Sequence, residues 1–326
     1  MNGLPGENDV SEVIAEIQGR IGCITLNRPK ALNALSLPMV RALTQALQRW
    51  QDDPQVLAVA VRGTGKEGPF GAFCAGGDIR FFHQAAHAGD TALGDFFTEE
   101  YALNHLIHTY AKPYIAFMDG IVMGGGMGIS QGASVRVVTE RTKMAMPETN
   151  IGLFPDVGGG WFLARCPGHV GEYLALTGQV IGGADAVYAG LADAVVDSAE
   201  LPQLWEQMAA GDTAALAAPR SKAQPAPGPL QAARESIDRF FGLPDIPTLI
   251  QALEADGGDT FFGEPELEPK DLMRLDPSGR GVILTGAARD AAAASAAITI
   301  RRSMSSRPRP NSSRTALTAG GSPPAA

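Results

Sequence analysis

The chain has few cysteines, few aromatic residues and no long apolar run. These features bear on its cellular compartment and on whether it spans a membrane. Its 326 residues contain three widely spaced cysteines, no CxxC pair and 6% aromatic side chains. An odd, sparse set of cysteines indicates reduced thiols, so we expect a cytoplasmic protein. No run of about 18 apolar residues occurs, and residues 1–11 lack the pattern of a secretory signal, so neither a membrane span nor secretion is predicted.

Positive charge is also in deficit. The formal net charge is −9 and the isoelectric point is about 5.1. This balance argues against non-specific nucleic-acid binding. An anionic ligand would have to be held by local cations or helix N-termini. Hydrophobic residues make up 45% of the chain, enough for a buried core, and 39 glycines and 23 prolines predict many turns.

Several common catalytic signatures are missing. The second glycine cluster, Gly124–Gly126, fails the GxGxxG spacing of a dinucleotide fingerprint, and the sequence has no Walker loop and no HExxH motif. His83 and His87 have helical spacing but no third ligand pattern accompanies them, so no metal site is predicted. Cys74 has no evident basic partner, and we do not interpret it as a nucleophile.

Hydrophobic patterning predicts alternating strands and helices, which is typical of a parallel α/β fold. Ser36 and Asp78 stand where N-caps are expected. Residues 63–73 and 151–160 are predicted to be loops. The predicted strands are 13–17, 21–26, 56–61, 114–117, 135–138 and 194–196. The first two are predicted to form a β-hairpin or strand pair. The predicted helices begin near residues 36, 79, 96, 124, 172, 183, 230 and 249.

Composition divides the chain into three parts. We expect a core over residues 1–200 and a helical region over 201–263, with an Ala/Pro/Lys-rich linker at 212–229. Residues 264–326 have an atypical pattern, and from Arg301 onward the composition is rich in Arg, Ser and Pro, which predicts a disordered tail.

Two glycine clusters could each direct a backbone N–H into a pocket. Gly76-Gly77 follows a predicted strand and loop, and Gly124–Gly126 opens a predicted helix. An ordinary turn and tight helix–sheet packing are the alternative interpretations of the two clusters. Glu148 and Asp156 follow, each preceded by proline. If both are buried in one cleft, their pKa values should rise and separate; otherwise one caps a helix and the other is solvated.

Pocket-facing N–H donors beside acids suit chemistry on a carbonyl that becomes an oxyanion, and a thioester is such a carbonyl. The joint pattern resembles the crotonase (enoyl-CoA hydratase/isomerase) superfamily from about residue 13 to 196, and more weakly to 262. Within it, the chain is most similar to the 3-hydroxyisobutyryl-CoA hydrolases. The stretches that carry this resemblance are 27–29, 73–80, 98–101, 119–120, 123–128 and 146–160.

The resemblance implies a crotonase-like ββα spiral core and a set of site residues. The N–H groups of Gly77 and Gly125 would form an oxyanion hole. Glu148 and Asp156 would be the acidic pair, with Asp156 either binding the 3-hydroxyl of the acyl group or assisting proton transfer. Glu100 would line the acyl pocket. By the same resemblance, Arg28 and the Ala75 carbonyl would lie along the CoA nucleotide, and no cofactor is expected because CoA is part of the substrate.

One departure bears on the reaction. Hydratases of this superfamily hold their water with two glutamates, and the first of those positions is Gly128 here. The remaining acids favour thioester hydrolysis, in valine catabolism, over hydration or isomerisation of an enoyl-CoA. A non-catalytic acyl-CoA binder is the third hypothesis, because the C-terminal residues depart from the family pattern. Monomeric and homo-oligomeric assembly both stay open.

Overall fold

A seven-stranded sheet forms the core of the computed structural model, which describes residues 11–211 and 226–256. The strands follow the order β1-β2-β3-β5-β7-β9, and β4 pairs with β3. β1 and β2 form the predicted antiparallel hairpin, and every later neighbour along this path is parallel. The strands are β1 (Val13–Gln18), β2 (Ile21–Leu26), β3 (Ala58–Gly65), β4 (Gly68–Pro69), β5 (Tyr114–Met118), β7 (Val135–Thr139) and β9 (Ala194–Val196).

Helices occupy the connections between these strands and the region that follows β9. The N-caps predicted at Ser36 and Asp78 are confirmed, because each side chain accepts a backbone hydrogen bond from the first turn of its helix. The helices are α1 (Leu37–Gln51), α2 (Ile79–Ala88), α3 (Ala92–His108), α4 (Gly125–Gln131), α5 (Gly159–Leu163), α6 (Val170–Thr177), α7 (Gly183–Tyr188), α8 (Leu201–Ala209), α10 (Pro229–Ala232), α11 (Arg234–Phe241) and α12 (Ile246–Asp256), with single 3₁₀ turns at η1 (Pro29–Ala31), η2 (Glu148–Ile151) and η3 (Ser198–Glu200).

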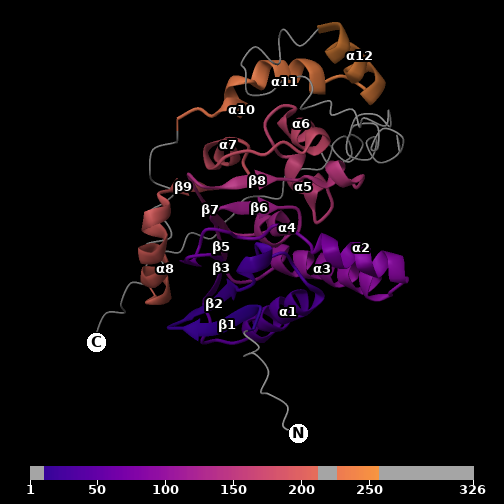
Figure 1. Ribbon diagram of the computed structural model, residues 1–326. Coiled ribbons are helices and arrows are strands. Elements are labelled where there is room, and N and C mark those ends of the chain that lie inside the picture. The colour runs from indigo at the N-terminus through magenta and orange to yellow at the C-terminus, as the bar shows by residue number, and fades with distance from the viewer. Residues whose placement is uncertain (1–10, 212–225, 257–326) are drawn as a thin grey trace.

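Apolar side chains cover both faces of the sheet. Trp205 and Met208 of α8 pack with Phe117 of β5 on one face. On the other, Trp50 of α1 and Leu103 of α3 join a larger cluster. Figure 1 shows α8 on one side of the stacked strands and α2 and α3 on the opposite side. Strands buried on both faces explain the continuous apolar runs in the sequence.

Some sequence predictions need correction. Residues 63–73 are not all loop, because β3 continues to Gly65 and turns back into β4. A second, two-stranded parallel sheet of β6 (Ile121–Met123) and β8 (Lys143–Ala145) was not anticipated. The 151–160 segment ends in the first residues of α5. The predicted tail and linker residues 212–225 lie outside the described residues. Among those described, no helix is long and apolar enough to cross a membrane.

Asp119 joins the end of β5 to its surroundings. This carboxylate is 1% exposed and accepts hydrogen bonds from the Gly71 nitrogen at 2.6 Å and from Thr139 Oγ1 at 2.6 Å. The guanidinium of Arg141 pairs with both of its oxygens. The next residue, Gly120, has φ +69°, and a methyl group there would lie 2.2 Å from the Gly71 carbonyl oxygen. The Asp-Gly pair therefore fixes the turn that leads into β6.

We expect Asp119→Ala to lower the free energy of unfolding by about 1–3 kcal/mol, because it removes the acceptor of the Gly71 N–H and leaves the buried Thr139 hydroxyl without its acceptor. Urea denaturation measures the change. Glu67→Ala, at an exposed turn, is the control and should shift stability by less than about 0.5 kcal/mol. Equal stability of the two variants would refute this role for Asp119.

Candidate active site

The two glycine clusters lie side by side in the structure. The segment before Gly76 runs next to β6: Cys74 forms a parallel bridge with Val122, and the Met123 nitrogen donates to the Cys74 carbonyl at 3.0 Å. The end of β6 is held from its other side, where the Gly124 nitrogen donates to Ala145 of β8 at 3.1 Å. The small second sheet therefore brings the clusters together.

The backbone nitrogens of Gly77 and Gly125 lie close to each other. A methyl group added at Gly76 would lie 3.4 Å from the Gly125 nitrogen, and one added at Gly125 would lie 3.4 Å from the Gly77 nitrogen. Neither N–H has a hydrogen-bond partner within the described part of the chain. Gly125 is the first residue of α4, so its N–H is one of the unpaired donors at a helix N-terminus. Two backbone donors without a partner among the described residues therefore lie close together.

Glu148 lies directly against the second glycine cluster. It opens η2 after Pro147, and its carboxyl is 7% exposed. A methyl group at Gly124 would be 2.7 Å from Oε1 of Glu148, so the acid reaches the second glycine cluster. Its Oε2 is buried and has no hydrogen-bond partner among the described residues. Burial, reinforced by the charge of Asp156, raises the pKa of Glu148 from 4.5 to about 8.

Glu100 approaches from α3. Its carboxyl is 3% exposed, and its Oε1 would lie 2.4 Å from a methyl group placed on Gly125. That oxygen has no hydrogen-bond partner in the described residues. Burial, followed by the charges of Asp156 and Glu148, raises the pKa of Glu100 to about 8. An α3 residue therefore contacts the same glycine whose N–H is open.

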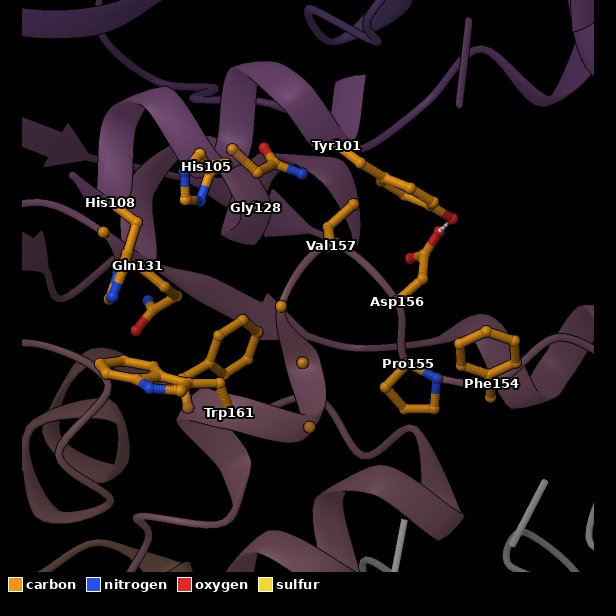
Figure 2. Close-up of a pocket in the computed structure, with 16 residues that line it drawn as sticks. Tyr101, His105, His108, Gly128, Gln131, Phe154, Pro155, Asp156, Val157 and Trp161 are labelled. Carbon is orange, nitrogen blue, oxygen red and sulfur yellow. Dashed lines mark hydrogen bonds between the residues drawn. The ribbon is translucent and has the colours of Figure 1, made fainter. Parts of the chain in front are cut away.

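Asp156 completes a group of three acids. It stands in the loop between η2 and α5, where Val157 has φ +42° and Gly158 has φ +89°. The hydroxyl of Tyr101 donates to its Oδ2 at 2.7 Å, and Figure 2 shows the two side chains pointing toward each other. Burial raises the pKa of Asp156, while the Tyr101 hydrogen bond acts in the opposite direction. The charge of Asp156 contributes to the raised pKa values of both glutamates.

A cavity of about 550 Å³ opens beside Asp156. Tyr101 and Asp156 lie at one end of it, and His108 and Trp161 lie at the other (Figure 2). The lining between them is largely apolar or glycine. The lining includes Asp156 but not Gly77, Gly125 or Glu148.

Gly128 lies one turn along α4 from Gly125 and is closely packed. A methyl group there would be 2.7 Å from Cβ of Val157 and 3.0 Å from both polar atoms of the Asn104 amide. Those amide atoms are buried without a hydrogen-bond partner in the described residues. Sequence reasoning missed Asn104, although its spacing of four from Glu100 places both on one face of α3.

Arg28 and Ala75 lie near the first glycine cluster, but only Arg28 already has hydrogen-bonding and ionic partners for its predicted binding group. The Arg28 guanidinium forms ion pairs with Glu12 at 2.9 Å and Asp78 at 2.8 Å and donates to the Ala34 carbonyl. The Ala75 carbonyl accepts no hydrogen bond within the described part of the chain. Contact of either residue with a nucleotide stays a prediction.

Cysteine and metal chemistry find no support at the site. Cys74 is wholly buried, and burial raises its pKa to about 12, so it is a poor nucleophile. The rings of His83 and His87 make an edge-to-face contact, with their centroids 4.4 Å apart. No group of three or more metal-binding side chains occurs among the described residues.

The arrangement therefore combines two open backbone donors with three partly or fully buried acids. No lysine or arginine of the described residues forms an ion pair with these acids, and burial is the main cause of each raised pKa. Such a site can stabilise negative charge that develops on a carbonyl oxygen, and it can accept or donate protons near neutral pH.

Similar curated proteins from several vertebrates share one name. The chain is 46% identical to "3-hydroxyisobutyryl-CoA hydrolase, mitochondrial" of Xenopus tropicalis over 73% of its own length and 64% of the relative's. It is 44% identical to the Danio rerio protein of that name over 82% of its own length and 71% of the relative's. The chain therefore spans roughly two thirds or less of several relatives. Their mitochondrial names contradict the cytoplasmic setting expected from the sequence, and that prediction is wrong.

Solved structures share the fold. A carnitinyl-CoA dehydratase from Mycobacterium thermoresistibile matches 91% of this chain and 81% of its own, at 37% identity and a TM-score of 0.72. An enoyl-CoA hydratase from Rhodobacter sphaeroides matches 75% of this chain and 74% of its own, at 41% identity and a TM-score of 0.65. These likenesses confirm the predicted crotonase-like α/β fold.

Two family models match the sequence. The model described as Helicase HerA-like C-terminal covers only residues 245–296, most of which lie outside the described residues. The model described as Enoyl-CoA hydratase/isomerase covers residues 21–268, which include the sheet, both glycine clusters and all three acids. With this match over most of the chain and relatives above 40% identity, the chain belongs to the enoyl-CoA hydratase/isomerase family.

Proposed function

We propose that the chain hydrolyses acyl-CoA thioesters, and specifically 3-hydroxyisobutyryl-CoA, a step of valine catabolism. The observation that carries this proposal is the convergence of two open glycine N–H groups with the buried carboxyl of Glu148. The name shared by relatives at 41–52% identity supports the choice of substrate.

In this proposal the thioester oxygen lies between the Gly77 and Gly125 N–H groups, which form the oxyanion hole. Both donors are fixed before substrate arrives, because strand β6 and the start of α4 hold their backbones. Fixed donors cost no reorganisation when the negative charge develops, and removal of one such donor typically lowers the rate about 10²–10³-fold. A side chain at Gly77 would collide with the Phe82 ring at 2.5 Å, and one at Gly125 would meet Oε1 of Glu100.

Glu148 is the proposed base or nucleophile. As a base it takes a proton from water, the water oxygen bonds to the carbonyl carbon, and the carbon–sulfur bond breaks to release CoA thiolate, which is then protonated. As a nucleophile its carboxylate bonds to the same carbon, CoA thiolate leaves, and water cleaves the resulting anhydride. Proximity of Oε1 to Gly124 supports both routes.

The other polar residues are proposed to bind the substrate. Asp156 would bind the 3-hydroxyl of the acyl group or assist proton transfer, and Glu100 would line the acyl pocket beside Gly125. Arg28 and the Ala75 carbonyl would lie along the CoA nucleotide. The chemistry needs no metal and no cofactor besides the CoA that belongs to the substrate.

Gly128 supports hydrolysis over hydration. Its position holds no acid, and Asn104 and Val157 already fill the space beside it. Hydration of an enoyl-CoA by this family would lack one of its two water-holding glutamates. Loss of one such acid or base typically costs about 10²–10⁴-fold in rate.

We expect Glu148→Gln and Asp156→Asn each to lower kcat for thiol release from 3-hydroxyisobutyryl-CoA by about 10²–10⁴-fold, because each removes a proton-transferring or substrate-binding carboxylate. Release of free thiol is followed across a short panel of acyl-CoA esters, and loss of enone absorbance is followed with crotonyl-CoA. Calorimetric titration with CoA should give a nearly unchanged Kd.

Glu67→Gln, at an exposed position, is the matched control and should leave all three readouts unchanged. Normal hydrolysis by both acid variants would refute the assignment of the acids. Consumption of crotonyl-CoA without thiol release would instead identify a hydratase, and CoA binding without turnover of either ester would identify a non-catalytic binder.

Introducing a glutamate at position 128, where hydratases of the family carry one, should not create hydratase activity. We expect Gly128→Glu to lower the melting temperature, because its first side-chain carbon meets Val157 at 2.7 Å and the Asn104 amide at 3.0 Å. We also expect no gain in crotonyl-CoA hydration. A stable variant with new hydratase activity would contradict the packing argument.

Burial of Glu148 should make the fold less stable as pH rises. Its pKa is about 8 in the folded protein against 4.5 for an unburied carboxyl, so between these values the folded state holds a proton that the unfolded state has lost. Stability therefore falls as pH rises through this window. Glu148→Gln does not titrate, and its melting temperature should exceed that of the wild type more at about pH 9 than at about pH 5. A pH-independent difference would contradict the raised pKa.

A further inference from the structure

The four residues 98–101 carry part of the resemblance to the hydrolases, yet the proposed mechanism uses only one of them. Glu99 forms a two-point ion pair with Arg41 of α1, with contacts of 2.8 and 2.7 Å. Glu100 points into the buried site beside Gly125. Tyr101 reaches across to Asp156. Consecutive helical residues point about 100° apart, so three neighbours on α3 contact three different parts of the protein.

Tyr101 is not held by burial. It is 42% exposed, and its ring makes an inclined contact with Phe97 one turn earlier at 6.0 Å. Its hydroxyl is nevertheless directed at Oδ2 of Asp156, 55 residues away in the sequence, at 2.7 Å. This geometry is that of a strong hydrogen bond from a hydroxyl to a carboxylate.

The orientation of Asp156 is not fixed by regular secondary structure. It belongs to neither helix nor strand, and the two residues after it adopt positive φ values, +42° at Val157 and +89° at Gly158. A β-branched residue in that conformation is strained, so the loop is held by its surroundings. Among the described residues, Tyr101 is the one side chain that donates a hydrogen bond to the Asp156 carboxylate.

We propose that Tyr101 is a positioning residue, whose hydroxyl holds the Asp156 carboxylate in one orientation beside the cavity and favours its ionised form. This inference rests on the proposed function, because it assigns Tyr101 a role through a proposed catalytic acid. A hydrogen bond donated to the charged form of a carboxyl stabilises that form. The ring alone cannot provide this, so the hydroxyl is the part that matters.

Other titratable groups face the same carboxylate. Glu100 and Tyr101 approach from α3 and Glu148 from η2, and all three are electrostatically coupled to Asp156. His105 and His108 line the adjoining cavity. Because Glu148 and Glu100 also ionise, a pH–rate profile alone would mix the contributions of these acids, and Asp156 has to be observed directly.

The test compares Tyr101→Phe with Tyr110→Phe. Both variants keep the ring and lose a hydroxyl, but the Tyr110 hydroxyl donates to the Leu47 carbonyl of α1, away from the acids. The side-chain carboxyl carbon of Asp156 is followed by carbon-13 NMR during a pH titration, with its signal assigned by Asp156→Asn. In parallel, kcat and KM for thiol release are measured.

We expect Tyr101→Phe to raise the pKa of Asp156 and to lower kcat by about 10- to 100-fold with little change in KM, as for the loss of one hydrogen bond to a charged group. Tyr110→Phe should match the wild type in both readouts. An unchanged Asp156 titration in Tyr101→Phe, or equal effects of the two variants, would overturn the inference. A wild-type protein that releases no thiol would overturn the proposed function, and the NMR titration would still decide whether Tyr101 controls Asp156.

Discussion

The site depends on one backbone contact, the alignment of the Cys74–Gly77 segment with strand β6. The bridge between Cys74 and Val122 sets the register of the two segments. On the opposite side, Leu35 forms hydrogen bonds with the backbone on both sides of Gly77. Its nitrogen donates to the Gly76 carbonyl at 2.7 Å, and its carbonyl accepts from the Asp78 nitrogen at 3.0 Å. The Gly77 N–H has no partner among the described residues, and its nitrogen lies close to Gly125. A shift of one residue in this register would turn that donor away.

Around these donors the protein gathers Glu100, Glu148 and Asp156 from three separate segments. Each carboxyl is at least partly buried, and no cation of the described residues pairs with it. Burying acids without partners is unfavourable for folding, and the cost grows as each is ionised. Packing alone gives no reason for such a cluster, whereas acids with pKa values near neutrality are suited to proton transfer. The electrostatics therefore favour a functional role over a structural one.

Sequence reasoning reached the local features and missed those that depend on long-range contacts. The β1–β2 hairpin and the caps at Ser36 and Asp78 are encoded within a few residues, and they are confirmed. The pairing of β6 with β8 joins two three-residue strands, too short to show a period. The Tyr101 contact crosses 55 positions and has no local signature. The cytoplasmic expectation was wrong because reduced, buried cysteines report redox state and do not specify a compartment.

The packing of α3 on α4 explains why the second acid of the proposed site comes from a loop. Glu100 lies against Gly125 and Asn104 lies against Gly128, so the two helices approach closely along a face of α4 that carries no side chains. The first side-chain carbon of an acid at Gly128 would meet Asn104 of α3 and Val157. The carboxylate is supplied instead by Asp156, next to Val157 in a loop with positive φ angles. An acid on such a loop needs an external support, and the helix that excludes it from α4 also provides the Tyr101 hydroxyl that holds it.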